Sequence, residues 1–407
     1  MENFSGYLKR LLFAIAGLAA LVALVNAFID PYGMFHIANI PGLNEIKSQA
    51  SQRGAVYKRV AAERVRPNGL VLGNSRAEIG FDPEHPAWPG DARPAFNLAL
   101  PGTGPDAAFS QLHQALVYSR PRVVILGLDF LDFRIGPQAG VQNSRSPSTW
   151  LDFVGEYGSA LLSLNALGDS ILTLRDQGNP YATRLTDRGF NPMQDYVAIA
   201  KQEGYHALFR QRDMENARSY LRGPKTVFLP DGKPASEFDT VRKIIALAKQ
   251  RGIKLHLLIY PYHVHSLILF ERSGLWPAFE AWKTELVKMI TVSDTAVLWD
   301  FSGPSSYSLE PVPPAGNLRQ AMHWYWEAGH FKKSLGDILL EQMFNHPADG
   351  SRPNKVGTRL TADNLATTLA AQRAALTVYK QMNNRDVEEL DAIVSSIKNK
   401  ITTQGQQ

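Results

Sequence analysis

Short apolar runs recur through the middle of the chain, and each is followed by a glycine, a proline or a small polar residue. Runs of this length, rich in Val, Ile and Leu and bounded by turn residues, are typical of buried strands. The five runs are Leu70–Leu72, Ala95–Leu100, Arg122–Leu128, Ile253–Tyr260 and Ala296–Phe301. We therefore predict a sheet of about five strands.

Apolar residues at helical spacing occupy the stretches between these runs. Such patterns begin near Asp106, cover Ser236–Gln250 and Phe279–Ile290, and begin again near Phe331. Strands that alternate with helices form parallel sheets with helices packed on their faces. The fold class is therefore predicted to be α/β.

The alternation of strands and helices is interrupted between residues 134 and 231. This segment is rich in Arg, Asn and Gln and contains helical stretches near 160–175 and 193–221. An insertion after the third strand is expected to rise over the carboxyl ends of the strands and shape a substrate cleft; a purely structural cap is the alternative. Beyond His346 the composition becomes polar, and 361–398 is predicted to be an amphipathic helical tail.

An uncharged apolar stretch, Leu11–Ile29, lies near the start of the chain between a Lys-Arg pair and Asp30. It has the roughly 20 residues that a helix needs to cross a bilayer. The basic flank is expected on the cytoplasmic side, so that everything after Asp30 is exported. A cleaved signal peptide is the competing interpretation, because Val25–Ala27 offers the small residues that signal peptidase accepts. We favour an uncleaved anchor because the apolar stretch is long.

These patterns divide the chain into five predicted parts. They are a cytoplasmic terminus (1–10), a transmembrane anchor (11–29), a juxtamembrane linker (30–69), the main α/β domain (70–345, with the insertion 134–231) and the helical tail (346–407). The linker is predicted to hold a helix from about Leu43 to Arg66. Its Lys and Arg side chains are expected to lie against anionic lipid or an acidic glycan, or to form the wet face of the helix.

The composition excludes several classes of function. The net charge of +5 is spread along 407 residues, which gives little support for a nucleic-acid partner. The absence of cysteine excludes disulfides, thiolate metal sites and cysteine nucleophiles. There is no Gly-rich phosphate loop, and His263, His265 and His323 carry no recognisable metal-ligand motif. The sequence therefore predicts neither a metal nor another cofactor.

A serine and a histidine are expected at the same edge of the predicted sheet. Ser75 comes just after the first apolar run, and His330 comes just before the last predicted helix. Parallel sheets place their chemistry at the carboxyl ends of their strands. An imidazole is the usual base for a serine nucleophile at neutral pH, and Glu327, three residues before His330, is placed to hold the tautomer of its ring. These residues predict a Ser-His-Glu triad.

Four short blocks carry a resemblance to the SGNH (GDSL-type) hydrolase superfamily. They are Gly73-Asn74-Ser75-Arg76, Asn97–Gly102, Gly127-Leu128-Asp129 and Glu327-Ala328-Gly329-His330. Their order and their positions at strand ends match the family from about Leu70 to Phe344, the insertion excepted. With its amino-terminal anchor, the chain is particularly similar to the exported members that modify bacterial polysaccharides, such as the alginate O-acetyltransferases and the D-alanyl transfer proteins. The resemblance implies a flavodoxin-like three-layer sandwich.

The resemblance also implies roles for individual residues. Ser75 is the expected nucleophile, His330 the general base and then acid, and an acidic residue, here Glu327, the orienting group. The oxyanion hole is expected from the backbone N–H groups of Ser75 and Gly102 and from an Asn side chain of the third block. The candidate substrate-binding residues are Arg76, Asn97, Asp129, Tyr262, His263 and His323.

Two positions depart from the family pattern. Glu327 stands where the family has an aspartate, and Asp129 stands where it has the third-block asparagine. A carboxylate would repel an oxyanion, so Asn74 is the candidate replacement donor. Asp129 is expected either to orient Arg76 or a substrate hydroxyl, or to cap the loop after its strand.

The expected function is transfer or hydrolysis of an acyl group, most simply acetyl, on a polysaccharide in the periplasm. The expected partners are the polysaccharide, the inner membrane and a membrane-bound acyl-donor protein, and the expected location is a single-pass inner-membrane protein. A catalytically silent module that binds glycan in an export machine is the alternative. A lipase-like esterase would need a large apolar cleft, which the polar insertion argues against.

Overall fold

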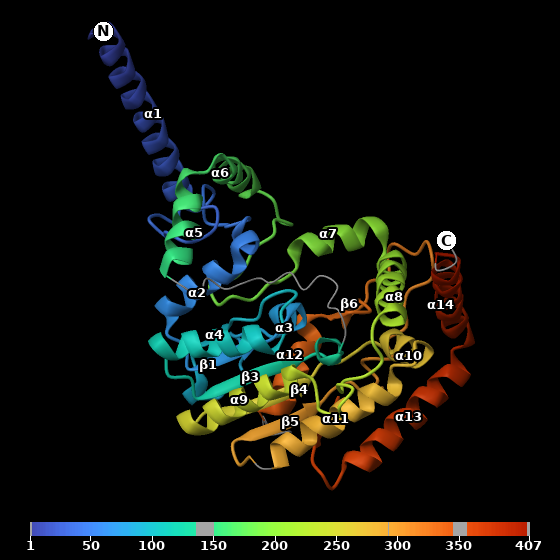
Figure 1. Ribbon diagram of the computed structural model, residues 1–407. Helices are drawn as coiled ribbons and strands as arrows, with labels where there is room; N and C mark the ends of the chain where they lie inside the picture. The colour runs from blue at the N-terminus through green and yellow to red at the C-terminus, as the bar shows by residue number, and fades with distance from the viewer. Residues whose placement is uncertain (1, 136–149, 292, 345–355, 405–407) are drawn as a thin grey trace. The chain divides into compact units, whose positions relative to one another are not determined.

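The computed structural model describes residues 2–135, 150–291, 293–344 and 356–404. The chain divides into two compact units, one formed by Met1–Arg64 with Arg145–Ala198 and the other by Val65–Ser144 with Ile199–Gln407 (Figure 1). The predicted insertion at 134–231 is therefore shared between the two units and does not form a single cap. Each unit is described by itself below.

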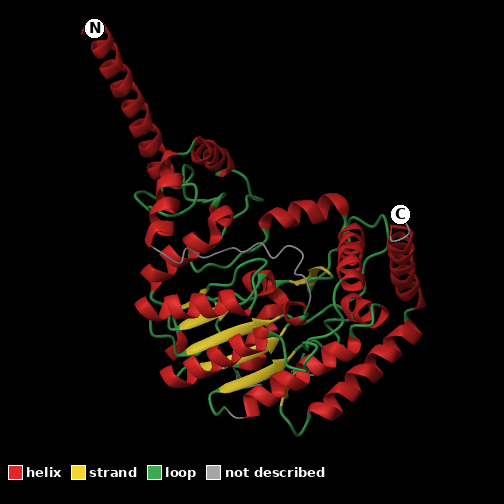
Figure 2. Cartoon of the chain, in the orientation of Figure 1, coloured by secondary structure: helices red, strands yellow, loops and turns green. Residues whose placement is uncertain are grey.

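A six-stranded sheet forms the centre of the second unit. Its strands are β1 (Gly69–Leu72), β2 (Ala95–Asn97), β3 (Val123–Leu128), β4 (Lys254–Ile259), β5 (Ala296–Asp300) and β8 (Thr358–Leu360). The spatial order is β2-β1-β3-β4-β5-β8, with five parallel strands and an antiparallel β8 at the edge (Figure 2). The five predicted strands are all present. The order of the first five is that of flavodoxin-like sheets, whose ligands bind at the carboxyl ends of the strands.

Helices pack on both faces of this sheet, as a buried parallel sheet requires. In Figure 1, α4 (Pro105–Tyr118), α9 (Ser236–Arg251) and α11 (Trp276–Thr291) lie on one face. On the other face, α3 (Ser75–Gly80) packs against α12 (Lys333–Met343). The fold is thus the three-layer α/β sandwich expected from the sequence.

The remaining helices of the second unit pack around the carboxyl-terminal helix α14 (Asn384–Gln404). They are α8 (Tyr205–Arg222), α10 (Val264–Arg272) and α13 (Leu365–Met382), whereas α7 (Gln194–Glu203) lies at the boundary between the units. The predicted tail helix is real but is interrupted at Asn383, and strand β8 precedes it. The sequence did not predict β8, because three residues with two exposed side chains leave no apolar run.

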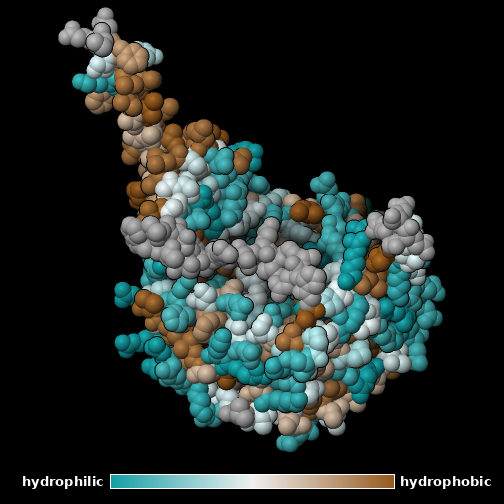
Figure 3. Space-filling model, viewed as in Figure 1, coloured by the Kyte–Doolittle hydropathy of each residue, from teal (hydrophilic) through white to brown (hydrophobic). Residues whose placement is uncertain are grey.

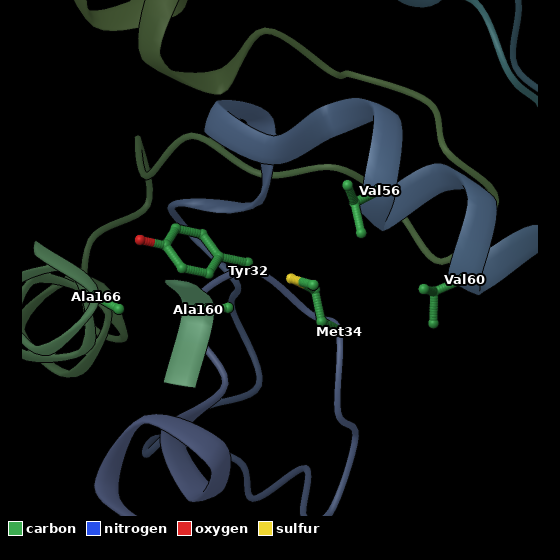
Figure 4. Packing of buried hydrophobic residues seen from close by; sticks show 6 residues of the cluster. All are labelled: Tyr32, Met34, Val56, Val60, Ala160 and Ala166. Carbon is green, nitrogen blue, oxygen red and sulfur yellow. The ribbon is translucent and has the colours of Figure 1, made fainter. Parts of the chain in front are cut away.

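The first unit joins the amino-terminal helix to part of the insertion. Its helices are α1 (Glu2–Ile29), α2 (Gly54–Val65), α5 (Trp150–Leu162) and α6 (Leu164–Asp176). Helix α1 packs against α5 and α6, and a small core of Tyr32, Met34, Val56, Val60, Ala160 and Ala166 joins the segment after α1 to α2, α5 and α6 (Figure 4). Between Phe4 and Ile29, α1 is long and apolar enough to cross a membrane, a test that a signal sequence also passes.

The linker differs from its prediction. Its α-helix begins only at Gly54, after a single 3₁₀ turn, and not near Leu43. Lys47 and Lys58 are buried, and Lys47 Nζ donates to the carbonyl of Ile29 at 3.2 Å. The expectation that these two side chains face lipid, glycan or water was therefore wrong.

Candidate active site

The loop after β1 brings Ser75 to the carboxyl edge of the sheet. Gly73 has a φ of +139°, which favours glycine, and a side chain there would meet the hydroxyl of Tyr260. That hydroxyl accepts the Asn74 N–H at 3.3 Å, and the Asn74 side chain caps α3 by accepting the Arg76 N–H at 3.0 Å. Ser75 is therefore the first residue of a capped helix, in a turn that a larger residue at position 73 would disrupt.

A short hairpin presents the other two predicted catalytic residues. Its strands are β6 (Tyr325–Glu327) and β7 (His330–Phe331). The turn between them is held from two sides: Arg76 Nε donates to the Gly329 carbonyl at 2.5 Å, and Ser266 Oγ donates to the Ala328 carbonyl at 2.9 Å. The residue after Ser75 thus positions the loop that carries the histidine.

Ser75, His330 and Glu327 form one continuous hydrogen-bonded chain. Ser75 Oγ lies 2.8 Å from His330 Nε2, and His330 Nδ1 contacts Glu327 Oε1. The His330 side chain is 21% exposed, whereas that of Glu327 is only 2% exposed. The histidine of this hydrogen-bonded series is therefore partly accessible to solvent, whereas the carboxylate of Glu327 is enclosed in protein.

The environment of Glu327 keeps its carboxylate ionised. Burial by itself would raise its pKa, but His330, the Arg212 guanidinium and the Gly329 N–H outweigh burial and lower the pKa to about 2. Oε2 accepts from the Gly329 N–H at 2.6 Å and from Arg212 Nε at 3.0 Å. Because an ionised carboxylate only accepts hydrogen bonds, Nδ1 of neutral His330 must carry the proton. Nε2 is then free to accept the proton of the Ser75 hydroxyl.

Asp129 is held by groups around it on every side. Oδ1 accepts from the Tyr262 hydroxyl at 2.8 Å and from the Leu131 N–H at 3.1 Å. Oδ2 accepts from Asn74 Nδ2 at 3.2 Å and forms an ion pair with Arg76. The two expectations, that Asp129 orients Arg76 and that it caps its loop, therefore describe the same side chain. The Arg76 charge compensates the carboxylate, so the anticipated repulsion of an oxyanion is reduced.

Both backbone N–H groups of the predicted oxyanion hole remain available. Within the described part of the chain, neither the Ser75 N–H nor the Gly102 N–H has a hydrogen-bond acceptor. The loop that carries Gly102 is tied to the end of β1, because Gly73 O accepts from the Leu100 N–H at 3.0 Å and from Thr103 Oγ1 at 3.3 Å. The Asn74 amide, in contrast, is directed to Asp129 and Arg76, so the two backbone groups are the better-placed donors.

Three candidate substrate-binding residues lie in the protein interior. Asn97 Nδ2 donates to the carbonyls of Ala77 and Phe81, both at 2.9 Å, and so fixes α3. Tyr262 supports Asp129, and His263 caps α10 and contacts the Glu310 carbonyl at 2.9 Å. All three are at most 1% exposed, so we do not carry them into the proposed site. The reason is the same for each: the polar groups that marked these residues in the sequence serve the backbone or a neighbouring side chain.

His323 and Arg76 have opposite environments. His323 is exposed, with its ring against Trp324 at a centroid distance of 4.2 Å, and remains a candidate for substrate contact. The Arg76 side chain is 10% exposed and is occupied by Asp129 and Gly329. Arg76 therefore positions the loop rather than offering a free cation.

A second acid–histidine pair lies beside the first but lacks a nucleophile. His265 Nδ1 lies 2.8 Å from Asp213 Oδ2, and both side chains are buried. His265 Nε2 is buried without a hydrogen-bond partner in the described part of the chain. Of these two described pairs, the Glu327–His330 pair alone has a serine hydroxyl at its outer nitrogen. No group of three or more metal-ligating side chains occurs among the described residues.

Arg212 and Tyr260 also support the site, and the sequence does not predict either contact. Arg212 belongs to α8 in the predicted insertion, 115 residues before Glu327, and nothing in its local sequence marks it among the other arginines there. Tyr260 directly follows β4, and its sequence position predicts only the last apolar residue of that strand. The glycines at 73 and 127 were its only signal, because a side chain at either position would meet its hydroxyl.

In comparisons with known proteins, no family model matches this chain, and no curated protein matches it significantly.

Proposed function

We propose that this chain is a membrane-anchored serine O-acyltransferase or esterase of the SGNH type, which acts on a cell-surface polysaccharide in the periplasm. The observation that supports it best is the hydrogen-bonded chain from the Ser75 hydroxyl through His330 to the Glu327 carboxylate. A serine activated in this way forms acyl-enzyme intermediates. The acyl group most simply transferred is acetyl.

The first half of the reaction acylates the serine. His330 Nε2 takes the proton of the Ser75 hydroxyl while Oγ attacks the carbonyl carbon of the donor. The Ser75 and Gly102 N–H groups are the candidate donors to the oxyanion of the tetrahedral intermediate. His330 then returns the proton to the leaving oxygen as the bond from the carbonyl carbon to that oxygen breaks. Glu327 stays ionised throughout and stabilises the imidazolium.

The second half removes the acyl group. A sugar hydroxyl gives its proton to His330 and attacks the acyl carbon, and Ser75 Oγ leaves and regains a proton from His330. If water attacks instead, the same steps release a carboxylic acid. Anchoring by α1 favours transfer, because a tether raises the local concentration of the enzyme near a membrane-bound acyl-donor protein and a nascent polymer.

The test uses the full chain in detergent micelles and a fluorophosphonate probe, which labels activated serines. We expect labelling of the unmodified chain, loss of labelling in Ser75→Ala, and unchanged labelling in the control Ser110→Ala on α4. An activated acetyl ester offered together with a neutral oligosaccharide then separates transfer from hydrolysis, because only transfer yields acetylated sugar.

The same experiment distinguishes the alternative function. A silent glycan-binding module would retain oligosaccharide binding without Ser75-dependent labelling or turnover, and that result would overturn the proposed catalysis. Labelling with release of free acetate only, in the presence of every sugar offered, would assign the chain as an esterase.

A further inference from the structure

The face of the α5–α6 hairpin that does not pack against α1 carries large apolar side chains in the open. We define the hairpin apolar face as Leu162, Leu164, Ile171 and Leu174. Leu164 is 77% exposed and Ile171 is 61% exposed. Residues 164, 171 and 174 lie on one side of α6 by helical geometry, whereas Asn165 projects about 100° away from Leu164. A contiguous, exposed apolar patch of this kind on a protein surface marks an interaction site.

This face continues the apolar surface of α1. Leu18 and Leu24 of α1 are exposed to a similar degree. Figure 3 shows that the hydrophobic surface of α1 continues to the carboxyl-terminal part of this helix, where α5 and α6 pack against it. Whatever apolar medium surrounds α1 therefore also reaches the hairpin. A lipid bilayer is the medium that fits, because α1 has the length and composition of a membrane span.

A polar residue within α1 shows how deep the hairpin lies. Asn26 is fully buried; its Nδ2 donates to the Leu161 carbonyl and its Oδ1 accepts from Ser170 Oγ, both at 2.9 Å. Polar groups inside a membrane must be satisfied by the protein. Asn26 lies three residues before the end of α1, which corresponds to about 5 Å along a helix. The turn of the hairpin is therefore beside the part of the apolar stretch that lies just inside its outer end.

We infer that the α5–α6 hairpin is embedded in the outer part of the membrane, with its apolar face against lipid acyl chains, and that it holds α1 as a retained anchor. Val22, Asn26 and Ile29, on one side of α1, are all buried in the unit. Cleavage near Ala27 would remove the first two of these contacts and leave Ser170 without its amide partner. The inference rests on the proposed anchoring and is independent of the acyl-transfer chemistry.

The absence of cysteine makes a direct test simple, because each introduced cysteine carries the only label. We would label Leu164→Cys, Ile171→Cys, Leu18→Cys and the matched control Asn165→Cys with a nitrobenzoxadiazole fluorophore. The full-length proteins are placed in excess vesicles of phosphatidylethanolamine and phosphatidylglycerol. Quenching by nitroxide-labelled lipid is compared with quenching by aqueous iodide. We expect lipid quenching at positions 164 and 171 to exceed that at 165 by about twofold or more.

The outcomes separate the inference from the proposal beneath it. Lipid quenching at 18 together with iodide quenching at 164 and 171 would overturn the embedded hairpin and leave the anchor intact. Absence of lipid quenching at 18 would overturn the anchor and the hairpin together, while Ser75 labelling tests the chemistry separately. Protection of 164 and 171 from both quenchers would show that protein, such as a second copy of the chain, covers this face, and would also overturn the inference.

Discussion

The Nε atom of Arg212 lies 3.0 Å from Oε2 of Glu327, so a helix of the insertion directly contacts the acidic member of the triad. The Arg212 side chain is 35% exposed, while its carboxylate partner is almost completely buried. A charged hydrogen bond to the orienting acid therefore comes from a segment far away in sequence. This contact connects the insertion to the proposed triad through charge.

Replacing Arg212 should weaken catalysis without destroying it. Arg212→Gln removes a positive charge from Glu327, raises the pKa of that carboxyl from about 2 and loosens its hold on the His330 ring. Charged hydrogen bonds contribute about 1.5–3 kcal/mol, so we expect the rate of Ser75 labelling to fall by about tenfold at pH 7. The fall should be larger at acidic pH. Arg212→Lys should recover part of the rate, and an unchanged rate in both variants would contradict this role.

Replacing Glu327 should be far more damaging. In Glu327→Gln the amide can donate to His330 Nδ1, which favours the tautomer with the proton on Nε2, where it cannot accept from Ser75. In other serine triads the comparable exchange lowers the rate about 10⁴-fold, and we expect a loss on the order of a thousandfold or more here. Pseudo-first-order labelling kinetics measure it. Glu215→Gln, which removes another ion-pair partner of Arg212, is the control and should label nearly as fast as the unmodified chain.

The three members of the proposed triad were easier to place from the sequence than the residues that support them. Ser75 follows an apolar run directly, and Glu327 and His330 are close in sequence, so their positions follow from strand ends and short spacings. Arg212 and Tyr260 reach the site from distant elements, where local sequence carries no mark of the contact. Asn97 and His263 show the reverse case: each polar residue near a strand end suggested a function in the sequence, whereas in the fold its side chain bonds to backbone carbonyl groups.

The ion pair between Asp129 and Arg76 should contribute strongly to stability. Both side chains are nearly buried, at 5% and 10% exposure, so Asp129→Asn leaves the enclosed Arg76 charge without its paired carboxylate. Breaking such a pair on one side costs about 3–5 kcal/mol. Urea unfolding monitored by near-ultraviolet circular dichroism measures the change. Asp294→Asn, which breaks an exposed pair with Lys249, should leave the midpoint nearly unchanged, and equal effects of the two variants would argue against a structural Asp129.

Asp132 should make the stability of the chain depend on pH near neutrality. Burial, with a smaller contribution from Glu237, raises its pKa from 3.8 to about 7, although Arg76 opposes the shift. Between these values the folded state holds a proton that the unfolded chain has released. The free energy of unfolding therefore falls as pH rises through this interval.

The variant Asp132→Asn isolates this effect, because an amide does not titrate. Relative to the unmodified chain, it should become more stable by about 1–3 kcal/mol between pH 5 and pH 8. Urea midpoints at the two pH values measure the difference. Asp239→Asn, at an exposed position on α9, is the control. A pH-independent difference between Asp132→Asn and the unmodified chain would show that this carboxyl does not titrate near pH 7.

The pair of Lys283 and Asp300 should secure the carboxyl-terminal helices to the sheet. Both side chains are fully buried, with Lys283 Nζ at 2.9 Å from Asp300 Oδ2, and Gln372 of α13 bonds to both. Lys283→Met leaves a buried carboxylate without its cation and should destabilise the fold by about 3–5 kcal/mol. It should also expose α13 to limited proteolysis. Adding Asp300→Asn removes the unpaired charge but keeps an oxygen for the Ser302 N–H, so the double variant should be more stable than Lys283→Met alone. A double variant less stable than either single one would mean that the charges themselves do not hold this edge of the sheet together.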